Sequence, residues 1–338
     1  MSNECSACRN KLEDFTPENP DDAIKFHQWL TNEKIEKVEI LGTVADAFSS
    51  LKKQLRTFLI HTYVKRKQAA HLDTLISECD TKKVVLQVDF SENATIMSQN
   101  EVQSAHWCHG QATLFTAHAW IEKDKTENLV LILDDLNHTK HSIYVYMEYI
   151  MRLLKQKYPL IEILNIFSDG PSSQFKQKYL FSNLHAWEQD HGFKIIWNFF
   201  ATSHGKGPVD GLGGSVKRSV WRHVKSGMSH IENAKEYAGV AKERNPNIHI
   251  EYIPHTEIND MKPSLDAKWL NVCMVPGTQQ LHCIVPNGPD KLLVAETSDA
   301  DSFTVVSIRK AEADGHDEEE EDNGEEDDGE DETDPTPA

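Results

Sequence analysis

The order of apolar runs between residues 84 and 136 constrains the fold of this chain more than any other feature. VVLQVDF (84–90) carries aliphatic residues on both faces of an extended chain, which predicts a buried strand. Two more apolar runs follow, TLFTAHAWI (113–121) and LVLILDDL (129–136), separated by the charged turn EKDKTEN. Three consecutive strands with no helix between them predict a meander.

After the meander, helical and strand patterns alternate. The predicted elements are a helix at 143–154, a strand at IEILNIF (161–167), a helix at 173–190, a strand at KIIWNFF (194–200) and a helix that follows the Gly-rich loop SHGKGPVDGLGG (203–214). This order mixes an antiparallel meander with parallel crossovers in one sheet, and an RNase H-like domain requires that order. We therefore expect residues 81–240 to form an α/β core, a mixed sheet flanked by helices.

Residues 1–80 are expected to be a helical N-terminal region with one Cys-x-x-Cys. One helix is predicted from Asp21 to about Leu30. A second, longer helix is predicted to begin at Thr43-Val-Ala-Asp46, which has the form of a capping box, and to run towards Cys79.

The character of the chain changes after Asn245-Pro246. Residues 247–310 are predicted to form a small β-rich module of short strands and turns, IHIEYIP, KWLNVCMVPG, QQLHCIVPNG, KLLVAE and FTVVSIR. Residues 311–338 hold 16 of the 54 acidic side chains and no Lys or Arg, so we expect a disordered acidic tail.

The formal net charge of −19 comes mostly from that tail. Residues 1–310 contain 35 basic and 38 acidic side chains, a net charge of −3, so the body of the chain does not exclude a nucleic-acid partner. The longest aliphatic run, residues 129–133, is far shorter than the roughly 18 residues of a membrane span, so no membrane contact is expected. The first residues lack the features of a signal peptide, and six cysteines in a chain of this length favour reduced thiols, so we expect an intracellular protein.

Three aspartates are the candidates for chemistry. Asp89 closes the first predicted strand, Asp169 closes the fourth, and Asp210 begins the last predicted helix of the core. If the two strands are parallel neighbours, both carboxylates emerge at the same edge of the sheet, and Asp210 can point back to that edge. Several carboxylates that converge in this way can hold the two divalent ions of phosphodiester cleavage. The alternative is that all three are ordinary aspartates of turns and helix caps.

Four sequence blocks between residues 80 and 230 carry a family resemblance. VDFSENA (88–94), QSAHW (103–107), FSDGPSSQFK (167–176) and NFFATSHGKGPVDGLGGSVKR (198–218) resemble, in this order, blocks of transposase-derived proteins of eukaryotic genomes with an RNase H-like core of the DDE class. The resemblance implies that Asp89, Asp169 and Asp210 are the catalytic acids and hold Mg²⁺ or Mn²⁺. Many relatives in the wider class use Glu as the third acid, and Glu188 and Asp190 are the other acids available here.

Basic residues near these acids are candidates for DNA binding. Lys206 lies in the Gly-rich loop, and the last core helix carries Lys217, Arg218, Arg222 and Lys225 beside or opposite its valine stripe. Such a face suits a phosphate backbone, and it is equally typical of a solvated amphipathic helix.

Cys5 and Cys8 are half of a zinc site, because a structural Zn²⁺ takes four ligands and no second pair lies at the usual distance. Either the other half of a zinc site lay upstream in a longer parent protein, or the motif is incidental.

The leading hypothesis for function is a DDE-type transposase, or a protein derived from one, that cleaves and joins DNA in the nucleus with two metal ions. The alternative is a domesticated, catalytically inactive protein that interacts with nucleic acid or chromatin. DNA is the expected partner, the acidic tail is a candidate contact for chromatin or basic proteins, and homo-oligomers are compatible with both hypotheses.

Overall fold

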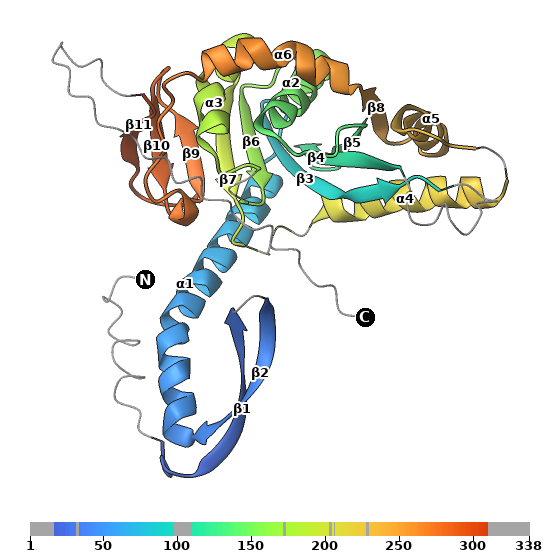
Figure 1. Ribbon diagram of the computed structural model, residues 1–338. Coiled ribbons are helices and arrows are strands. Elements are labelled where there is room, and N and C mark those ends of the chain that lie inside the picture. The colour runs from blue at the N-terminus through green and yellow to red at the C-terminus, as the bar shows by residue number, and fades with distance from the viewer. Residues whose placement is uncertain are drawn as a thin grey trace. The chain divides into compact units, whose positions relative to one another are not determined.

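The computed structural model describes residues 17–31, 34–97, 110–171, 174–202, 205, 207–227 and 230–309 (Figure 1). The chain divides into two compact units, Met1–Arg66 and Lys67–Ala338. The acidic tail, together with Cys5, Cys8 and Lys206, lies outside the described residues.

The first unit contains a β-hairpin. Strands β1 (Ala23–Thr31) and β2 (Ile35–Thr43) pair in antiparallel register. The predicted helix from Asp21 to Leu30 is therefore wrong. Ile24, Phe26 and Leu30 are half-buried, whereas Lys25, His27 and Trp29 are exposed, and this alternation has the period of two that belongs to a strand.

Helix α1 (Val44–Ser77) follows the hairpin and confirms the predicted capping box. The backbone N–H of Thr43 donates to Oδ2 of Asp46 at 2.9 Å, and the N–H of Asp46 donates to Oγ1 of Thr43 at 3.2 Å. These two bonds satisfy backbone donors that would otherwise have no partner at the helix start.

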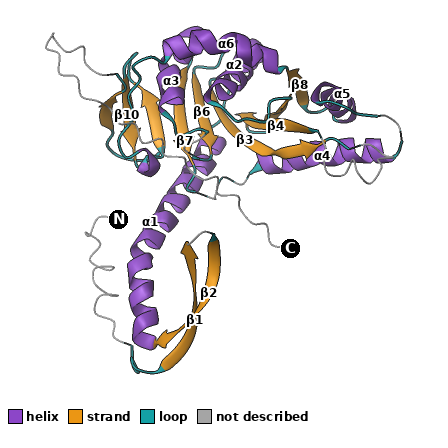
Figure 2. Ribbon diagram, in the orientation of Figure 1, coloured by secondary structure: helices purple, strands orange, loops and turns teal. Residues whose placement is uncertain are grey.

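The second unit is built on one nine-stranded mixed sheet (Figure 2). The strands are β3 (Lys83–Thr95), β4 (Gln111–Glu122), β5 (Lys125–Leu133), β6 (Ile163–Ser168), β7 (Lys194–Phe199), β8 (His249–Ile253), β9 (Cys283–Pro286), β10 (Lys291–Ala295) and β11 (Thr304–Ser307). Their order across the sheet is β11-β10-β9-β7-β6-β3-β4-β5-β8. The predicted meander is confirmed, because β3, β4 and β5 are successive antiparallel neighbours, and β6 and β7 continue the sheet parallel to β3.

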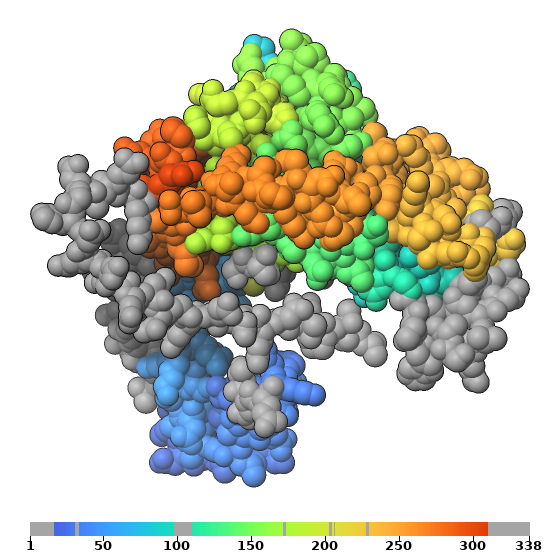
Figure 3. Space-filling model, turned by 45° about the horizontal axis from the view of Figure 1, so that its top comes forward, coloured from blue at the N-terminus to red at the C-terminus, as the bar shows by residue number. Residues whose placement is uncertain are grey.

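Helices cover both faces of this sheet. They are α2 (Lys140–Lys157), α3 (Lys178–His191), α4 (Pro208–Lys225), α5 (Ala234–Arg244) and α6 (His255–Lys268), and a 3₁₀ turn spans Thr278–Gln280. Val84, Leu86 and Val88 of β3 belong to the core shared with α2, α3 and α6, whereas α4 and α5 form a second core against β4, β5 and β8. Figure 3 shows α6 in orange beside α2 in green.

The strands after residue 247 do not form a module of their own. β8 pairs in parallel with β5, and β9 pairs antiparallel with β7, so the C-terminal segment extends both edges of the predicted five-stranded core. The physical reason is that exposed sheet edges carry unpaired N–H and C=O groups, which an added strand satisfies. The expected strand KWLNVCMVPG is also wrong, because α6 ends at Lys268 and the segment after it forms no strand.

One close contact between α4 and β3 gives a stability prediction. A Cβ built at Gly213 would lie 2.3 Å from Oγ of Ser91, whereas one built at Gly214 meets nothing within 4 Å. We expect Gly213→Ala to lower the free energy of unfolding by about 1–3 kcal/mol, the usual cost of overpacking. Gly214→Ala should instead raise it by up to about 1 kcal/mol through helix propensity. Urea unfolding of both variants checks this, and equal effects would contradict it.

Candidate active site

The parallel register of β3 and β6 brings two of the predicted aspartates to the same level of the sheet. The last registered pair is Gln87 with Phe167, and two residues further along each strand stand Asp89 and Asp169. Asp169 follows Ser168, the last residue of β6. Asp89 does not close its strand as expected, because β3 continues to Thr95 in its pairing with β4. Both carboxylates therefore lie at the sheet rim, by which we mean the position where β6 ends and β3 continues beyond it.

Asp89 lies on the face of the sheet that α4 covers. Its alternate neighbours define this face: Gln87 donates from Nε2 to the carbonyl of Gly205 at 2.8 Å, and Ser91 packs against Gly213 of α4. Side chains two residues apart on a strand share a face, so Asp89 points to the same side. Asp210 lies in the first turn of α4, the helix that packs against this face.

The charges of Asp169 and Asp210 influence the ionisation of Asp89. Burial raises the pKa of Asp89 to about 7, and the charges of Asp169 and Asp210 add to this effect, against a lowering by the N–H of Phe90. The pKa of Asp169 is raised by burial and then by Asp210, and the Gly205 backbone partly offsets the rise. Carboxylates that share a site resist simultaneous ionisation, so Asp89 binds a proton at higher pH than an ordinary aspartate does.

The loop before α4 is fitted tightly over the rim. A Cβ at Gly205 would lie 1.8 Å from Oδ1 of Asp169, and a Cβ at Gly207 would lie 2.4 Å from Oε1 of Gln87. Both positions therefore require glycine for its size. The groups that the backbone approaches this closely are protein side chains.

One carboxylate oxygen at the rim lacks the partners that burial demands. Oδ1 of Asp169 is buried and makes no hydrogen bond within the described structure. A buried carboxylate oxygen is costly unless a proton, a donor or a cation satisfies it. Carboxylate oxygens are the donors that a hard divalent cation prefers, so the chemistry of these side chains suits such an ion.

Asp210 also has a structural role. Its Oδ2 accepts a hydrogen bond from the backbone N–H of Gly207 at 2.7 Å, which caps the start of α4. The positive end of the helix dipole at this point favours nearby negative charge. Capping and participation in the acidic cluster are compatible, because the second oxygen of Asp210 is not used by the cap.

The two other acids considered for the third position are not at this rim. Glu188 accepts from the backbone N–H of Ile195 at 2.8 Å, at the start of β7 and hence at the edge of the sheet opposite Asp169. Asp190 lies two residues further along α3. Among the described residues, no group of three or more His, Cys, Asp or Glu side chains is arranged so that it could hold a metal ion as it stands.

The basic helix face predicted for α4 is present. Val216, Val220 and Val224 are buried, whereas Arg218, Arg222 and Lys225 are exposed. Lys217 is half-buried, and its Nζ donates to the carbonyl of Glu92 at 3.0 Å and lies 3.6 Å from Oε2 of Glu92.

Sequence reasoning missed Gln87, the residue that ties the loop before α4 to the sheet. Gln87 is 1% exposed and sits in the middle of the apolar run VVLQVDF. A polar side chain inside a buried strand needs a partner, and that requirement was the available signal.

These observations define the class of protein: a mixed α/β protein with an acidic cluster at a sheet rim, next to a basic helix. Residues 68–298 match the family described as Domain of unknown function (DUF8701), and the chain belongs to that family. A comparison with curated proteins gives no match. Within the described residues, no helix has the length and apolar character needed to cross a membrane.

Proposed function

We propose that this protein is a DDE-type transposase, or is derived from one, and that it cleaves and transfers DNA strands at the rim formed by Asp89, Asp169 and Asp210. The observation that carries the proposal is the parallel register of β3 and β6, which sets Asp89 beside Asp169 under the first turn of α4. The order β5-β4-β3-β6-β7 supports an RNase H-like core, because it is the order in which a meander is followed by two parallel crossover strands.

In this proposal the chain's own residues position charge. Asp89, Asp169 and Asp210 would hold Mg²⁺ or Mn²⁺, and the bound ions would activate a hydroxyl nucleophile and stabilise the leaving oxygen. Gln87 and the glycines at 205 and 207 fix the loop against the rim. The cations of α4 would hold the phosphate backbone next to the acids.

A second candidate function follows from the cap made by Asp210. Since Oδ2 of Asp210 already serves the N–H of Gly207, the residue has a role that needs no metal. A domesticated protein that binds nucleic acid or chromatin and has lost cleavage would keep this arrangement for the stability of α4.

Incubation of the purified full chain with supercoiled plasmid DNA, in Mg²⁺, Mn²⁺ or EDTA, separates the two functions. The enzyme should convert supercoiled DNA to the nicked form with either ion and not with EDTA. DNA binding without nicking under any of these conditions would favour the inactive protein, and neither binding nor nicking would contradict both.

A further inference from the structure

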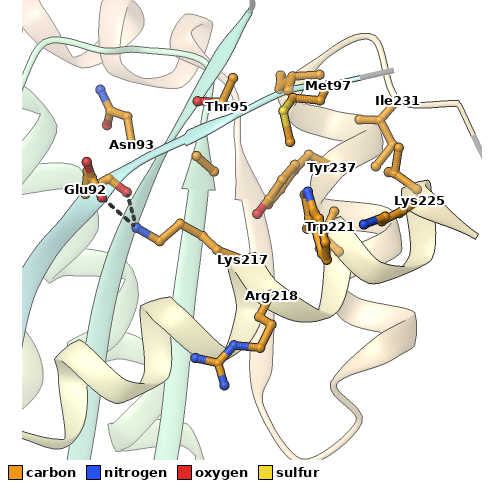
Figure 4. A pocket seen from close by; sticks show the side chains of 14 residues that line it. Glu92, Asn93, Thr95, Met97, Lys217, Arg218, Trp221, Lys225, Ile231 and Tyr237 are labelled. Carbon is orange, nitrogen blue, oxygen red and sulfur yellow. Dashed lines mark hydrogen bonds and ion pairs between the residues drawn. The ribbon is translucent and has the colours of Figure 1, made fainter. Parts of the chain in front are cut away.

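A pocket of about 590 Å³ lies between the far end of β3 and the second half of α4 (Figure 4). It is separate from the acidic rim, and none of its lining residues is one of the three aspartates. Its floor is apolar, with Ile96, Val220, Val224 and Ile231 among the lining side chains, and two aromatic residues, Trp221 and Tyr237, complete it.

The indole ring of Trp221 gives this pocket a flat apolar surface that solvent can reach. It is 44% exposed, an unusual position for the largest apolar side chain, whereas Tyr237 is 3% exposed and supports the floor. Nζ of Lys225 lies 4.5 Å from the centre of the Trp221 ring. A cation held over the ring restricts its orientation, so the indole is presented as a fixed platform.

The charge around the pocket is positive. Lys217, Arg218 and Lys225 line it, and Glu92 is the one acidic residue among the described residues that line it. Figure 4 shows Lys217 reaching across to Glu92 and Arg218 pointing away from β3. An apolar floor with an aromatic platform and a cationic rim suits a ligand with a flat apolar body and a negative charge.

The pocket is aligned with the acidic rim along one helix. Asp210, Lys217 and Trp221 are spaced by seven and four residues, so all three project from nearly the same side of α4. The 11 residues from Asp210 to Trp221 correspond to about 16 Å of helix. That length spans about five nucleotide steps of roughly 3.4 Å along one strand of a DNA duplex.

We propose that this pocket receives an unpaired base of the DNA strand that is cleaved at the rim, stacked on Trp221, with the neighbouring phosphates on Arg218 and Lys225. This inference rests on the proposed function and adds a base-binding subsite about five nucleotides from the scissile phosphate. The floor is mostly apolar, so the subsite accepts a base by stacking and shows little sequence preference.

The acidic segment 311–338 fits this pocket less well than a DNA strand does. It could neutralise the cations, but it contains no aromatic residue and no Leu, Ile, Val or Met that would cover the apolar floor. A DNA strand supplies both the negative charge and the flat apolar groups.

The test measures binding of a fluorescein-labelled DNA hairpin with a single-stranded arm to the full chain, by anisotropy in EDTA, so that no cleavage is needed. Trp221→Ala should weaken binding about 5- to 150-fold, the range found for loss of one stacked base, with an unchanged salt dependence. Trp221→Phe should retain most of the affinity. Arg218→Gln should make the dependence of log binding constant on log salt concentration shallower, its negative slope being smaller in magnitude by about 0.7–0.9. Trp29→Ala, which removes another exposed tryptophan, is the matched control and should bind as the wild type does.

An abasic scan of the arm identifies the stacked nucleotide. One abasic position should weaken wild-type binding as much as Trp221→Ala does, and the Trp221→Ala variant should be insensitive to that abasic position.

A protein that nicks DNA, but whose binding changes neither with an abasic position nor with Trp221→Ala, would overturn the pocket proposal and leave the proposed function intact. If binding depends on Trp221 and on the base at one position but the protein never nicks DNA, the pocket proposal is supported and the proposed DNA cleavage is contradicted. The last outcome uses a synthetic peptide of residues 311–338. If Trp221→Ala weakens binding of this peptide as much as binding of the DNA hairpin, the pocket belongs to the acidic segment and the proposal is overturned.

Discussion

Asp89→Asn should lower the rate of metal-dependent nicking by about 10²- to 10⁴-fold. The substitution keeps the size and shape of the side chain and removes its charge, at the position where β3 lies beside the end of β6. Metal ions contribute several kcal/mol to phosphodiester cleavage, and about 1.36 kcal/mol corresponds to a tenfold rate. Initial rates of plasmid nicking in Mn²⁺ measure the effect, and Asp169→Asn should reproduce it.

The matched control is Glu162→Gln. This exposed carboxylate precedes β6 at the opposite edge of the sheet and pairs with Lys82 at 2.6 Å. Its substitution changes the net charge by the same amount and should leave nicking unchanged. If Asp89→Asn nicks DNA as fast as Glu162→Gln does, the acidic rim is not the site of cleavage.

Asp210→Asn separates the two roles of the third acid. The amide oxygen of Asn can still accept from the backbone N–H of Gly207, so the stability of α4 should change little. Loss of nicking with unchanged thermal stability would assign Asp210 to catalysis as well as to the cap. Full nicking by this variant would leave the cap as its only role.

The five core strands were predictable because each is an apolar run bounded by polar residues. β3, for example, is buried from Val84 to Val88, so its hydrophobicity alone identifies it. The order of strands and helices then limits the topology, since parallel neighbours need a crossover and antiparallel neighbours do not. Asp89 and Asp169 could therefore be placed together before any coordinates were known.

The remaining differences have local physical causes. The strand β1 carries Lys25, His27 and Trp29 on its exposed side, so few of its residues are apolar in the expected alternation. β1 is recognised as a strand through its pairing with β2, and residues 21–30 alone carry no sign of that pairing. Similarly, the short strands β8 and β9 belong to the large sheet because they pair with β5 and β7, and such long-range pairings leave no local pattern.

The detailed geometry of the rim was also beyond the sequence. A Gly-x-Gly segment predicts close approach of the backbone to some group. That this group is Gln87 and Asp169 depends on how the loop crosses the sheet. The pocket at Trp221 was likewise unpredictable, since a tryptophan on an amphipathic helix is more often packed in the core.

The stability of the protein should depend on pH through Asp89. The pKa of Asp89 is about 7 in the native protein, compared with an ordinary value of 3.8. Between these two values the native state binds more protons than the unfolded state, so the free energy of unfolding should fall as the pH rises from about 4 to 7. At pH 8 the full cost of ionising Asp89 is present. Asp89→Asn removes this cost and should stabilise the protein at pH 8 by about 2–4 kcal/mol, since one pKa unit corresponds to about 1.36 kcal/mol.

Urea unfolding of the wild type and Asp89→Asn at pH 5 and pH 8 measures this difference. The variant's advantage should be large at pH 8 and smaller at pH 5, because at pH 5 the wild-type carboxyl is still protonated. Glu162→Gln, which removes an exposed carboxylate, should show no such pH-dependent gain. Adding Mg²⁺ at pH 8 should raise the stability of the wild type and not that of Asp89→Asn, because an ion bound only by the native state shifts the unfolding equilibrium. A gain that is equal at both pH values would mean that Asp89 is not the group whose ionisation destabilises the rim.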